Sequence, residues 1–568
     1  MGLLILEPPN ASIVPGTVIL DQLAAHGNGI TSNLKQRKWN TTSVILAPQP
    51  SEDPNDPLNW PKWKRGLVFY IILFGLIIHG MSPLLNPGIV QISQELNRPV
   101  TDIAELISYM LITSGVSGLF VSALGRKYGK RPVYVTASIL GTVAVIIAEV
   151  ATGYNVLLAS RVLQGISVVA YESLASATVG DLYFVHERGS QIALMIFILT
   201  GIVNGVSILA GVITANLGWH YNFHISVPFA ALQTILVILF VPETVYRRDV
   251  AYETDIAGSI SYATGTVIKD RPLTEPKKDV PIVNDPKSEP DEIHIEQLAE
   301  TEPRTQATRK KTFLQELRLY NAVLIADPLW KLVVACPTIL FNVGASYQVI
   351  MSGVIVSFNV GISILTGVVF ASPPYHLSSA TIGYMSTGPL LGSIIATMFC
   401  FAITGPMVRW LARRNAGIYE PEFSLLGLIP GCILTLAGLL SWGYSVNTAA
   451  SIYLICFEWA LMLGGMTVIS VFATQYALDS FRANSTEVFT MSMIFKNMFF
   501  YGITRFIIQW YTEYGPVHVL GIMAGITAFL CLLGFPLYVF GKRYRDFWQR
   551  HNMLRILNLE TDHLGAEE

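Results

Sequence analysis

Two charged residues in the fourth apolar stretch have a spacing that suits chemistry inside a membrane. Arg161, Gln164, Gly165, Val168 and Glu172 recur at i, i+3, i+4, i+7 and i+11, which is one face of an α-helix. Arg161 and Glu172 would therefore face the same space, about 16 Å apart along the axis. Burying an ionisable side chain in a span is costly unless it faces a cavity or a partner, so both are candidate functional residues.

A further carboxylate, Glu458, stands beside Trp459 in the tenth apolar stretch. Two carboxylates among aromatic rings suit a cation, through ion pairing and cation–π attraction, or a proton. If the chain is a duplication, the fourth and tenth stretches are symmetry mates, and Glu172 and Glu458 face each other across a central cavity. Two other interpretations stay open: Lys496 neutralises Glu458, and Glu172 belongs to a structural hydrogen-bond network.

Uncharged polar residues add weaker candidates. Asn342 and Gln348 either line a cavity or join helices, and sequence does not separate these roles. His79 lies in the first stretch and could titrate near neutral pH, although a lone membrane histidine is more often a hydrogen-bonded structural residue.

A cationic loop joins the second and third apolar stretches. Its members are Gly125, Arg126, Lys127, Gly129, Lys130 and Arg131. One interpretation is plain retention of positive charge on the cytoplasmic side. The other is a cytoplasmic latch that must break when two halves of a transporter move.

The elements that must position these residues are helices. Of the 568 residues, 52% are hydrophobic and 13% are charged, and apolar runs of about 20 residues suit helices that cross a lipid bilayer. We predict an all-α membrane protein with twelve transmembrane helices in two pseudo-symmetric six-helix halves. The tripeptide Asp-Pro-Leu at 56–58 and again at 327–329 supports the duplication.

Composition sets the predicted boundaries. They are an N-terminal tail (1–62), a first half (63–243), a charged and proline-rich linker with a possible interfacial helix near its end (244–329), a second half (330–541) and a C-terminal tail (542–568). Lys and Arg concentrate in one set of alternate loops, which places both termini and the linker in the cytoplasm.

Several protein classes are excluded or disfavoured. The net charge of −2 offers no field for nucleic acid, and the five cysteines have no paired spacing that suggests a metal site. The sequence has no HExxH, GxSxG or Walker motif, so we predict neither an enzyme nor an ATP-driven pump, and no cofactor.

Several motifs resemble those of the major facilitator superfamily, in particular its fungal twelve-span drug:proton antiporter branch. They include Arg161-Val162-Leu163-Gln164-Gly165, the loop at 125–131, Asp56-Pro57-Leu58-Asn59-Trp60-Pro61 and Pro242-Glu243-Thr244. The resemblance implies a role for Arg161 in proton coupling, a plasma-membrane location and a monomer. Two departures are Arg126, where the family has an aspartate, and Val206, where the antiporter signature has a proline.

Within that branch, the combination of Tyr171 and Glu172 with Glu458 is similar to fungal polyamine and organic-cation transporters, and Trp459, beside Glu458, is a further candidate for the substrate site. We therefore expect a proton-coupled transporter of small organic cations, with polyamines favoured. Asn342 and Gln348 are expected to help bind the substrate, and Arg161, Glu172 and Glu458 to handle the proton. The alternatives are a drug:proton antiporter that exports hydrophobic compounds and a nutrient sensor that does not transport.

Overall fold

The structure is a computed structural model, and it describes residues 4–8, 14, 16–19, 36–39, 42–45, 50–51, 53–246, 310–320, 323–325, 327–415, 418–481, 484–551, 553–557 and 559. The predicted linker lies largely outside these residues. Helices account for nearly all of the two predicted halves, as expected for apolar segments that must satisfy their own backbone hydrogen bonds. The first half consists of η1 (Pro57–Asn59), α2 (Lys62–His79), η2 (Ser82–Gly88), α3 (Ile89–Glu95), α4 (Val100–Tyr128), α5 (Lys130–Glu149), α6 (Tyr154–Leu182), α7 (Val185–Phe197), η3 (Ile198–Ile202), α8 (Val203–Leu217) and α9 (His220–Phe240).

The second half begins after the linker and has the same alternation of long helices and short breaks. Its elements are α12 (Leu329–Thr338), η4 (Ile339–Phe341), α13 (Val343–Val369), α14 (Ser379–Met385), α15 (Thr387–Arg414), η5 (Pro421–Gly427), α16 (Leu428–Asn447), α17 (Ile452–Ser480), α18 (Ser485–Thr504), α19 (Ile507–Arg550) and α20 (Met553–Ile556). Tight turns at glycine separate some helices: Gly129, between α4 and α5, has φ of 97°, a conformation in which a side chain is strained. Gly515, with φ of 79°, divides α19 into a short first part and the last long helix.

Eleven helical segments of the described chain are long and apolar enough to cross a membrane. They correspond to eleven of the twelve predicted spans, with the seventh split into α12 and the longer α13. The predicted eleventh span is α18, which has 20 residues but carries Glu487, Lys496 and Asn497. Polar residues within α18 therefore explain why the apolar count falls one short of twelve.

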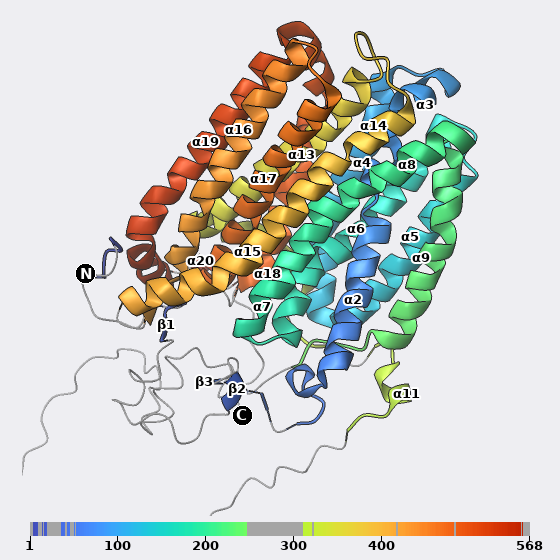
Figure 1. Ribbon diagram of the computed structural model, residues 1–568. Helices are drawn as coiled ribbons and strands as arrows, with labels where there is room; N and C mark the ends of the chain where they lie inside the picture. The colour runs from blue at the N-terminus through green and yellow to red at the C-terminus, as the bar shows by residue number, and fades with distance from the viewer. Residues whose placement is uncertain are drawn as a thin grey trace, which may run out of the picture.

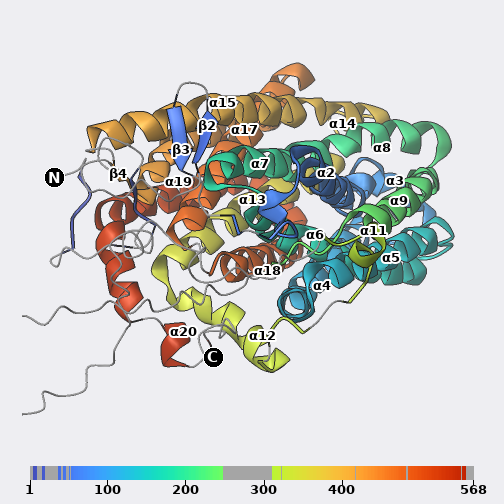
Figure 2. The ribbon, with the colours of Figure 1, turned by 90° about the horizontal axis from the view of Figure 1, so that it is seen from below.

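The long helices run side by side in one bundle, with the first half (blue to green) and the second half (yellow to red) next to each other (Figure 1). Seen from below, α4 lies beside α18, and α8 lies beside α14 (Figure 2), and both pairs are in contact. We call the end of the bundle where α4 ends and α18 begins the terminal end, because the N-terminal strand β1 lies there, and the opposite end the distal end. These two helix pairs form the principal contacts between the halves.

Short strands and a short helix lie at the terminal end. Strand β1 (Val18–Ile19) pairs antiparallel with β4 (Ile418–Tyr419), so the N-terminal segment is attached to the second half. A hairpin joins β2 (Gln36–Trp39) to β3 (Thr42–Ile45).

One short helix lies near the end of the predicted linker, where the sequence suggested a possible interfacial helix. Helix α11 (Phe313–Glu316) has four residues and begins with a capping box at Thr312. Glu316 forms an ion pair of 2.7 Å with Lys64 of α2, which attaches the end of the linker to the first half.

A buried charge cluster stabilises the terminal end of the second half. Arg545 of α19 pairs with Glu420 at 2.9 Å and Glu422 at 2.8 Å, and all three side chains are at most 2% exposed. Lys542 and the Thr17 hydroxyl also contact Glu420, at 2.7 and 2.8 Å. The N-terminal segment therefore completes a network that the loop after α15 and the end of α19 begin.

Replacing Arg545 by methionine should lower the free energy of unfolding by about 3–5 kcal/mol, because the buried Glu422 would lose the cation that it pairs with and Glu420 would keep only Lys542. The matched control is Arg550→Met: Arg550 pairs with Asp546 at 2.9 Å but is 45% exposed, so its loss should cost less than about 1 kcal/mol. Thermal unfolding of both purified variants measures the difference. Equal melting temperatures for the two would contradict a stabilising role of the cluster.

Candidate functional site between the two halves

The carboxylate of Glu172 lies at the interface between the halves and contacts a cation from the opposite half. Lys496 Nζ of α18 is 2.8 Å from Glu172 Oε2 of α6, and the side chains are 17% and 10% exposed. Both helices place these residues away from their ends, Lys496 eleven positions after Ser485 and Glu172 ten before Leu182. This is an ion pair inside the bundle whose two charges belong to different halves.

Lys496 is therefore the partner of Glu172 and not of Glu458, contrary to one of the sequence-based interpretations. The backbone of Lys496 is also fixed, because its carbonyl accepts a hydrogen bond of 2.9 Å from Ser357 of α13. Phe495 and Phe499, the neighbours of Lys496 on α18, stack in parallel with centroids 5.7 Å apart. These contacts fix the part of α18 that carries Lys496.

Glu458 lies in a different environment. Its Oε1 accepts a hydrogen bond of 2.7 Å from Ser445 of α16, and its side chain is buried. Helix α16 packs on α17 and α19 within the second half, so Glu458 faces α16 there. The structure thus brings Glu172 to Lys496 and Glu458 to Ser445, and does not bring the two glutamates together.

The alignment of the two predicted symmetry mates explains this outcome. Helices α6 and α17 each have 29 residues, and aligned end to end they pair Glu172 with Ser470 and Glu458 with Ser160. Because the helix rises 1.5 Å per residue, the two glutamates differ in depth by roughly 18 Å. Helices α6 and α17 therefore correspond to each other in the two halves, but their glutamates do not occupy equivalent positions.

Tyr171, predicted to bind substrate, is enclosed in the first half. Its hydroxyl accepts a hydrogen bond of 2.8 Å from Gln233 of α9 and lies 2.5 Å from Ser138 Oγ of α5. Its ring stacks on that of His79, whose Nε2 is 3.1 Å from Gln233 Oε1. This network joins α2, α5, α6 and α9, so His79 has the structural role considered above and Tyr171 points away from the ion pair.

Arg161 is fully buried in the first half without a carboxylate partner among the described residues. It donates a hydrogen bond of 2.7 Å to Gln164, one turn along α6, and its guanidinium lies 5.0 Å from the Phe223 ring centroid. Its Nε and Nη2 have no hydrogen-bond partner. Because a guanidinium stays protonated in proteins, Arg161 can influence a proton through its charge but cannot carry one.

The remaining predicted polar residues lie in the second half. Asn342 caps α13, accepting hydrogen bonds from the backbone N–H groups of Gly344 and Ala345 at 3.0 and 3.2 Å, as an N-cap residue does. Gln348 donates a long hydrogen bond of 3.4 Å to Thr474 of α17, and Trp459 is buried. None of these three contacts the Glu172–Lys496 pair.

A ladder of polar contacts, which sequence reasoning missed, joins α4 to α18 along their whole length. From the distal to the terminal end the pairs are Glu105–Arg505 at 2.6 Å, Ser114–Asn497 at 3.0 Å, Ser122–Thr490 at 3.1 Å and Arg126–Glu487 at 2.5 Å. Arg505 also donates hydrogen bonds to the Tyr109 and Tyr501 hydroxyls. These pairs become visible only when α4 and α18 are placed antiparallel and in register in the folded structure.

The cationic loop divides its contacts between the halves. Arg126 reaches Glu487 of the second half, and Lys127 Nζ donates a hydrogen bond of 3.0 Å to the Asp327 carbonyl ahead of α12. Lys130 pairs at 2.5 Å with Asp181 of its own half.

The carboxylate of Glu243 fixes the turn of this loop. It accepts hydrogen bonds from the Lys130 and Arg131 backbone at 3.0 and 3.1 Å. A Cβ at Gly129 would lie 2.2 Å from a Glu243 oxygen, so this turn needs glycine; Gly125 instead packs against Leu174. Arg126, which replaces the aspartate of the family motif, thus supplies a contact between the halves.

Glycines form the second contact between the halves. A Cβ at Gly211 of α8 would lie 2.8 Å from the Cα of Gly383 of α14, so the two backbones touch. The π-helical turn η3 precedes α8 and places Thr200 3.3 Å from Thr467 of α17. The spaced glycines of the fifth span therefore serve helix contact, without the proline of the antiporter signature.

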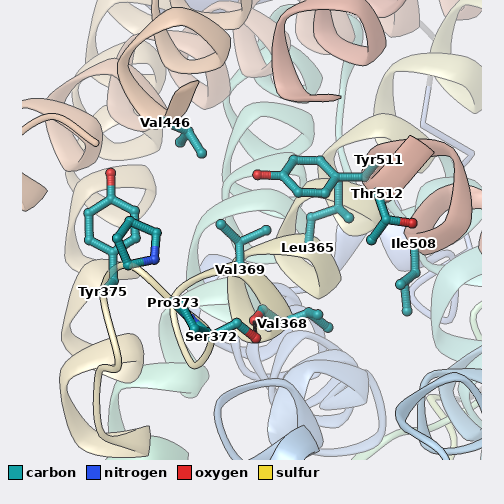
Figure 3. A pocket seen from close by; sticks show the side chains of 11 residues that line it. Leu365, Val368, Val369, Ser372, Pro373, Tyr375, Val446, Ile508, Tyr511 and Thr512 are labelled. Atoms are coloured by element: carbon teal, nitrogen blue, oxygen red, sulfur yellow. Dashed lines mark hydrogen bonds between the residues drawn. The ribbon is translucent and has the colours of Figure 1, made fainter. Parts of the chain in front are cut away.

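A cavity of about 170 Å³ lies at the distal end of the second half, between the ends of α13 and α16 and the start of α19. Figure 3 shows its lining, which is largely apolar with Tyr375 and Tyr511 at its sides. It has no charged side chain and contains none of the predicted site residues. It is separate from the ion pair.

Two six-helix halves with an ion pair between them define a polytopic membrane carrier. The sequence model of the Major Facilitator Superfamily matches residues 68–495, and the chain belongs to this family. Its fold is that of a transporter and not of an enzyme.

Comparison with individual proteins agrees with this assignment. The chain is 24% identical to Protein HOL1 of Saccharomyces cerevisiae over 96% of this chain and 97% of that protein. It is 22% identical to an uncharacterised MFS-type transporter of Schizosaccharomyces pombe, C1271.10c, over 96% and 95%. Among solved structures, the proton:xylose symporter XylE aligns with a TM-score of 0.55 at 11% identity, covering 84% of this chain and 97% of XylE.

Proposed function

We propose that the chain is a proton-coupled transporter of small organic cations, with polyamines as the favoured class. It works by alternating access of the two halves in the plasma membrane, as a monomer with both termini in the cytoplasm. The observation that carries the proposal is the Glu172 carboxylate, which is 10% exposed between the halves and bound by an ammonium group. The proposal keeps Glu172 as the cation ligand and omits Glu458 and Tyr171, which face other helices.

The chemistry of Lys496 supports the choice of polyamines. A lysine side chain is an ammonium group on a four-carbon chain, which is the same group as the aminobutyl arm of spermidine. The contact of 2.8 Å between the Lys496 ammonium and Glu172 within the bundle supports the binding of such a group at this carboxylate. A substrate with this arm could replace Lys496 on the same carboxylate.

Export of hydrophobic compounds is the second candidate. It is favoured by relatives such as "Efflux pump radE" of Floropilus chiversii, which is 22% identical over 87% of this chain and 84% of that protein. In that case Glu172 would serve proton exchange alone, and the apolar substrate would bind elsewhere.

Transport of labelled spermidine by the purified chain in proteoliposomes tests the proposal. We expect a pH gradient to drive spermidine flux, a protonophore to remove most of it, and unlabelled putrescine, but not xylose, to compete. Correctly inserted protein that moves a hydrophobic dye under the same gradient but no spermidine would overturn the cation proposal in favour of export.

A further inference from the structure

Lys496 stands where the ammonium group of a substrate would bind. Its Nζ lies 2.8 Å from Glu172 Oε2, and 17% of the lysine side chain is exposed. A single carboxylate balances the charge of one ammonium group. A substrate ammonium can therefore bind Glu172 only if it displaces the Lys496 ammonium or if Lys496 has lost its proton and is neutral. The lysine and the substrate therefore compete for one site.

Other charged groups near α18 are engaged elsewhere. Helices α4, α6, α12, α13, α17 and α19 pack against α18, and α13 carries no charged residue. The other charged side chains on the remaining helices, up to the first part of α19, each contact a partner other than Lys496. On α4 and α6 these pairs are Asp102 with Arg98, Glu105 with Arg505, Arg126 with Glu487, Lys127 with the Asp327 carbonyl, Arg161 with Gln164, and Asp181 with Lys130. On α12, α17 and the first part of α19 they are Lys331 with Asp327, Glu458 with Ser445, Asp479 with Tyr419, and Glu513 with Gln509. In the long part of α19, Lys542, Arg545, Asp546 and Arg550 pair at the terminal end, Arg543 donates to the Glu7 carbonyl, and His518 lies near the distal start of that helix.

Resting on the proposed cation site, we propose that Lys496 is the proton-carrying group of this transporter and the residue that couples cation binding to proton release. When a substrate ammonium binds Glu172, the Lys496 ammonium gives up one proton to water on the open side and remains as a neutral amine. The carboxylate keeps its single negative charge, now balanced by the substrate. When the substrate leaves, the amine takes a proton from water and the ion pair forms again.

The charges of the site explain why lysine suits this role. Counting only the ammonium group bound to Glu172, the pair consists of one negative and one positive charge both before and after exchange, so the buried carboxylate is never left without a cation. Lysine is a side chain that loses its proton readily when its surroundings disfavour the charge, whereas the guanidinium of Arg161 does not. Glu172 is paired with a cation in both states, with Lys496 in one and with the substrate in the other, so one substrate molecule and one proton move in opposite directions.

Proton release on binding tests this inference directly. The purified full-length chain is mixed with spermidine in weakly buffered detergent solution at neutral pH, and a pH indicator and labelled spermidine report protons released and ligand bound. We expect about one proton per spermidine for the wild type. Lys496→Met should bind about 10-fold more tightly and release almost none, because its competitor and its proton are both gone.

Lys496→Arg is the second variant. It preserves the ion pair with Glu172, so it remains available as a test if Lys496→Met fails to fold. A permanently charged competitor should weaken spermidine binding more than 10-fold and abolish proton release. Wild-type protein that binds spermidine without releasing protons, or Lys496→Arg protein that releases as many as the wild type, would overturn the role of Lys496 and leave the cation site intact. Wild-type protein that binds no spermidine would instead overturn the proposed function.

Discussion

Replacing Glu172 by glutamine should lower the rate of spermidine transport about 100-fold. The variant keeps the shape of the side chain but removes the negative charge that binds Lys496 and that we propose binds the substrate. Truncating one partner of a buried, hydrogen-bonded charge pair costs about 2–5 kcal/mol, and each 1.4 kcal/mol corresponds to a factor of ten. Initial rates in proteoliposomes, corrected for the amount of inserted protein, measure the effect.

Two further variants separate this effect from misfolding. Glu458→Gln changes the same residue type within another span, and because Glu458 contacts Ser445 away from the interface, transport should stay within about twofold to threefold of the wild type. The double variant Glu172→Gln, Lys496→Met removes both charges, so its melting temperature should recover while its transport does not. Equal losses for Glu172→Gln and Glu458→Gln would contradict the assignment of Glu172.

Reversing the charge of Arg126 should open the terminal end of the bundle. In Arg126→Glu two carboxylates would meet where Arg126 and Glu487 now pair at 2.5 Å, and like charges in contact cost several kcal/mol. We expect spermidine transport to fall about 10-fold. Thr490 is fully buried and lies close to this pair, so a cysteine placed there in a cysteine-free background reports the opening. This cysteine should react with a hydrophilic maleimide about 10-fold faster in the Arg126→Glu variant than in the protein that keeps Arg126.

The exchange of both charges provides the control. Arg126→Glu combined with Glu487→Arg restores an attractive pair in the reverse order, so the cysteine at position 490 should be protected again and transport should recover to within about threefold. Failure of the exchange to restore either property, with the protein folded, would show that Arg126 acts through contacts other than Glu487.

The membrane helices could be predicted from composition because the bilayer imposes one requirement on every span. The apolar runs predicted all the long helices, and α18 was found despite its Lys496 and Asn497. The motif Arg161 to Gly165 indicated the family, which the match over residues 68–495 confirms. Prediction was poorer for the short elements at the terminal end, such as the pairing of β1 with β4, because two-residue strands carry no periodic signal.

The candidate site depended on both levels of information. Sequence alone shows that few charged residues lie within the spans and that Glu172 and Lys496 are among them, because the cost of burying charge makes such residues rare. Which of these residues contact one another is seen in the folded structure: Lys496 of α18 contacts Glu172, while Glu458 contacts Ser445. Pairing between helices more than three hundred residues apart is set by their rotation and register in the bundle, and helical periodicity within a single span contains no information about either.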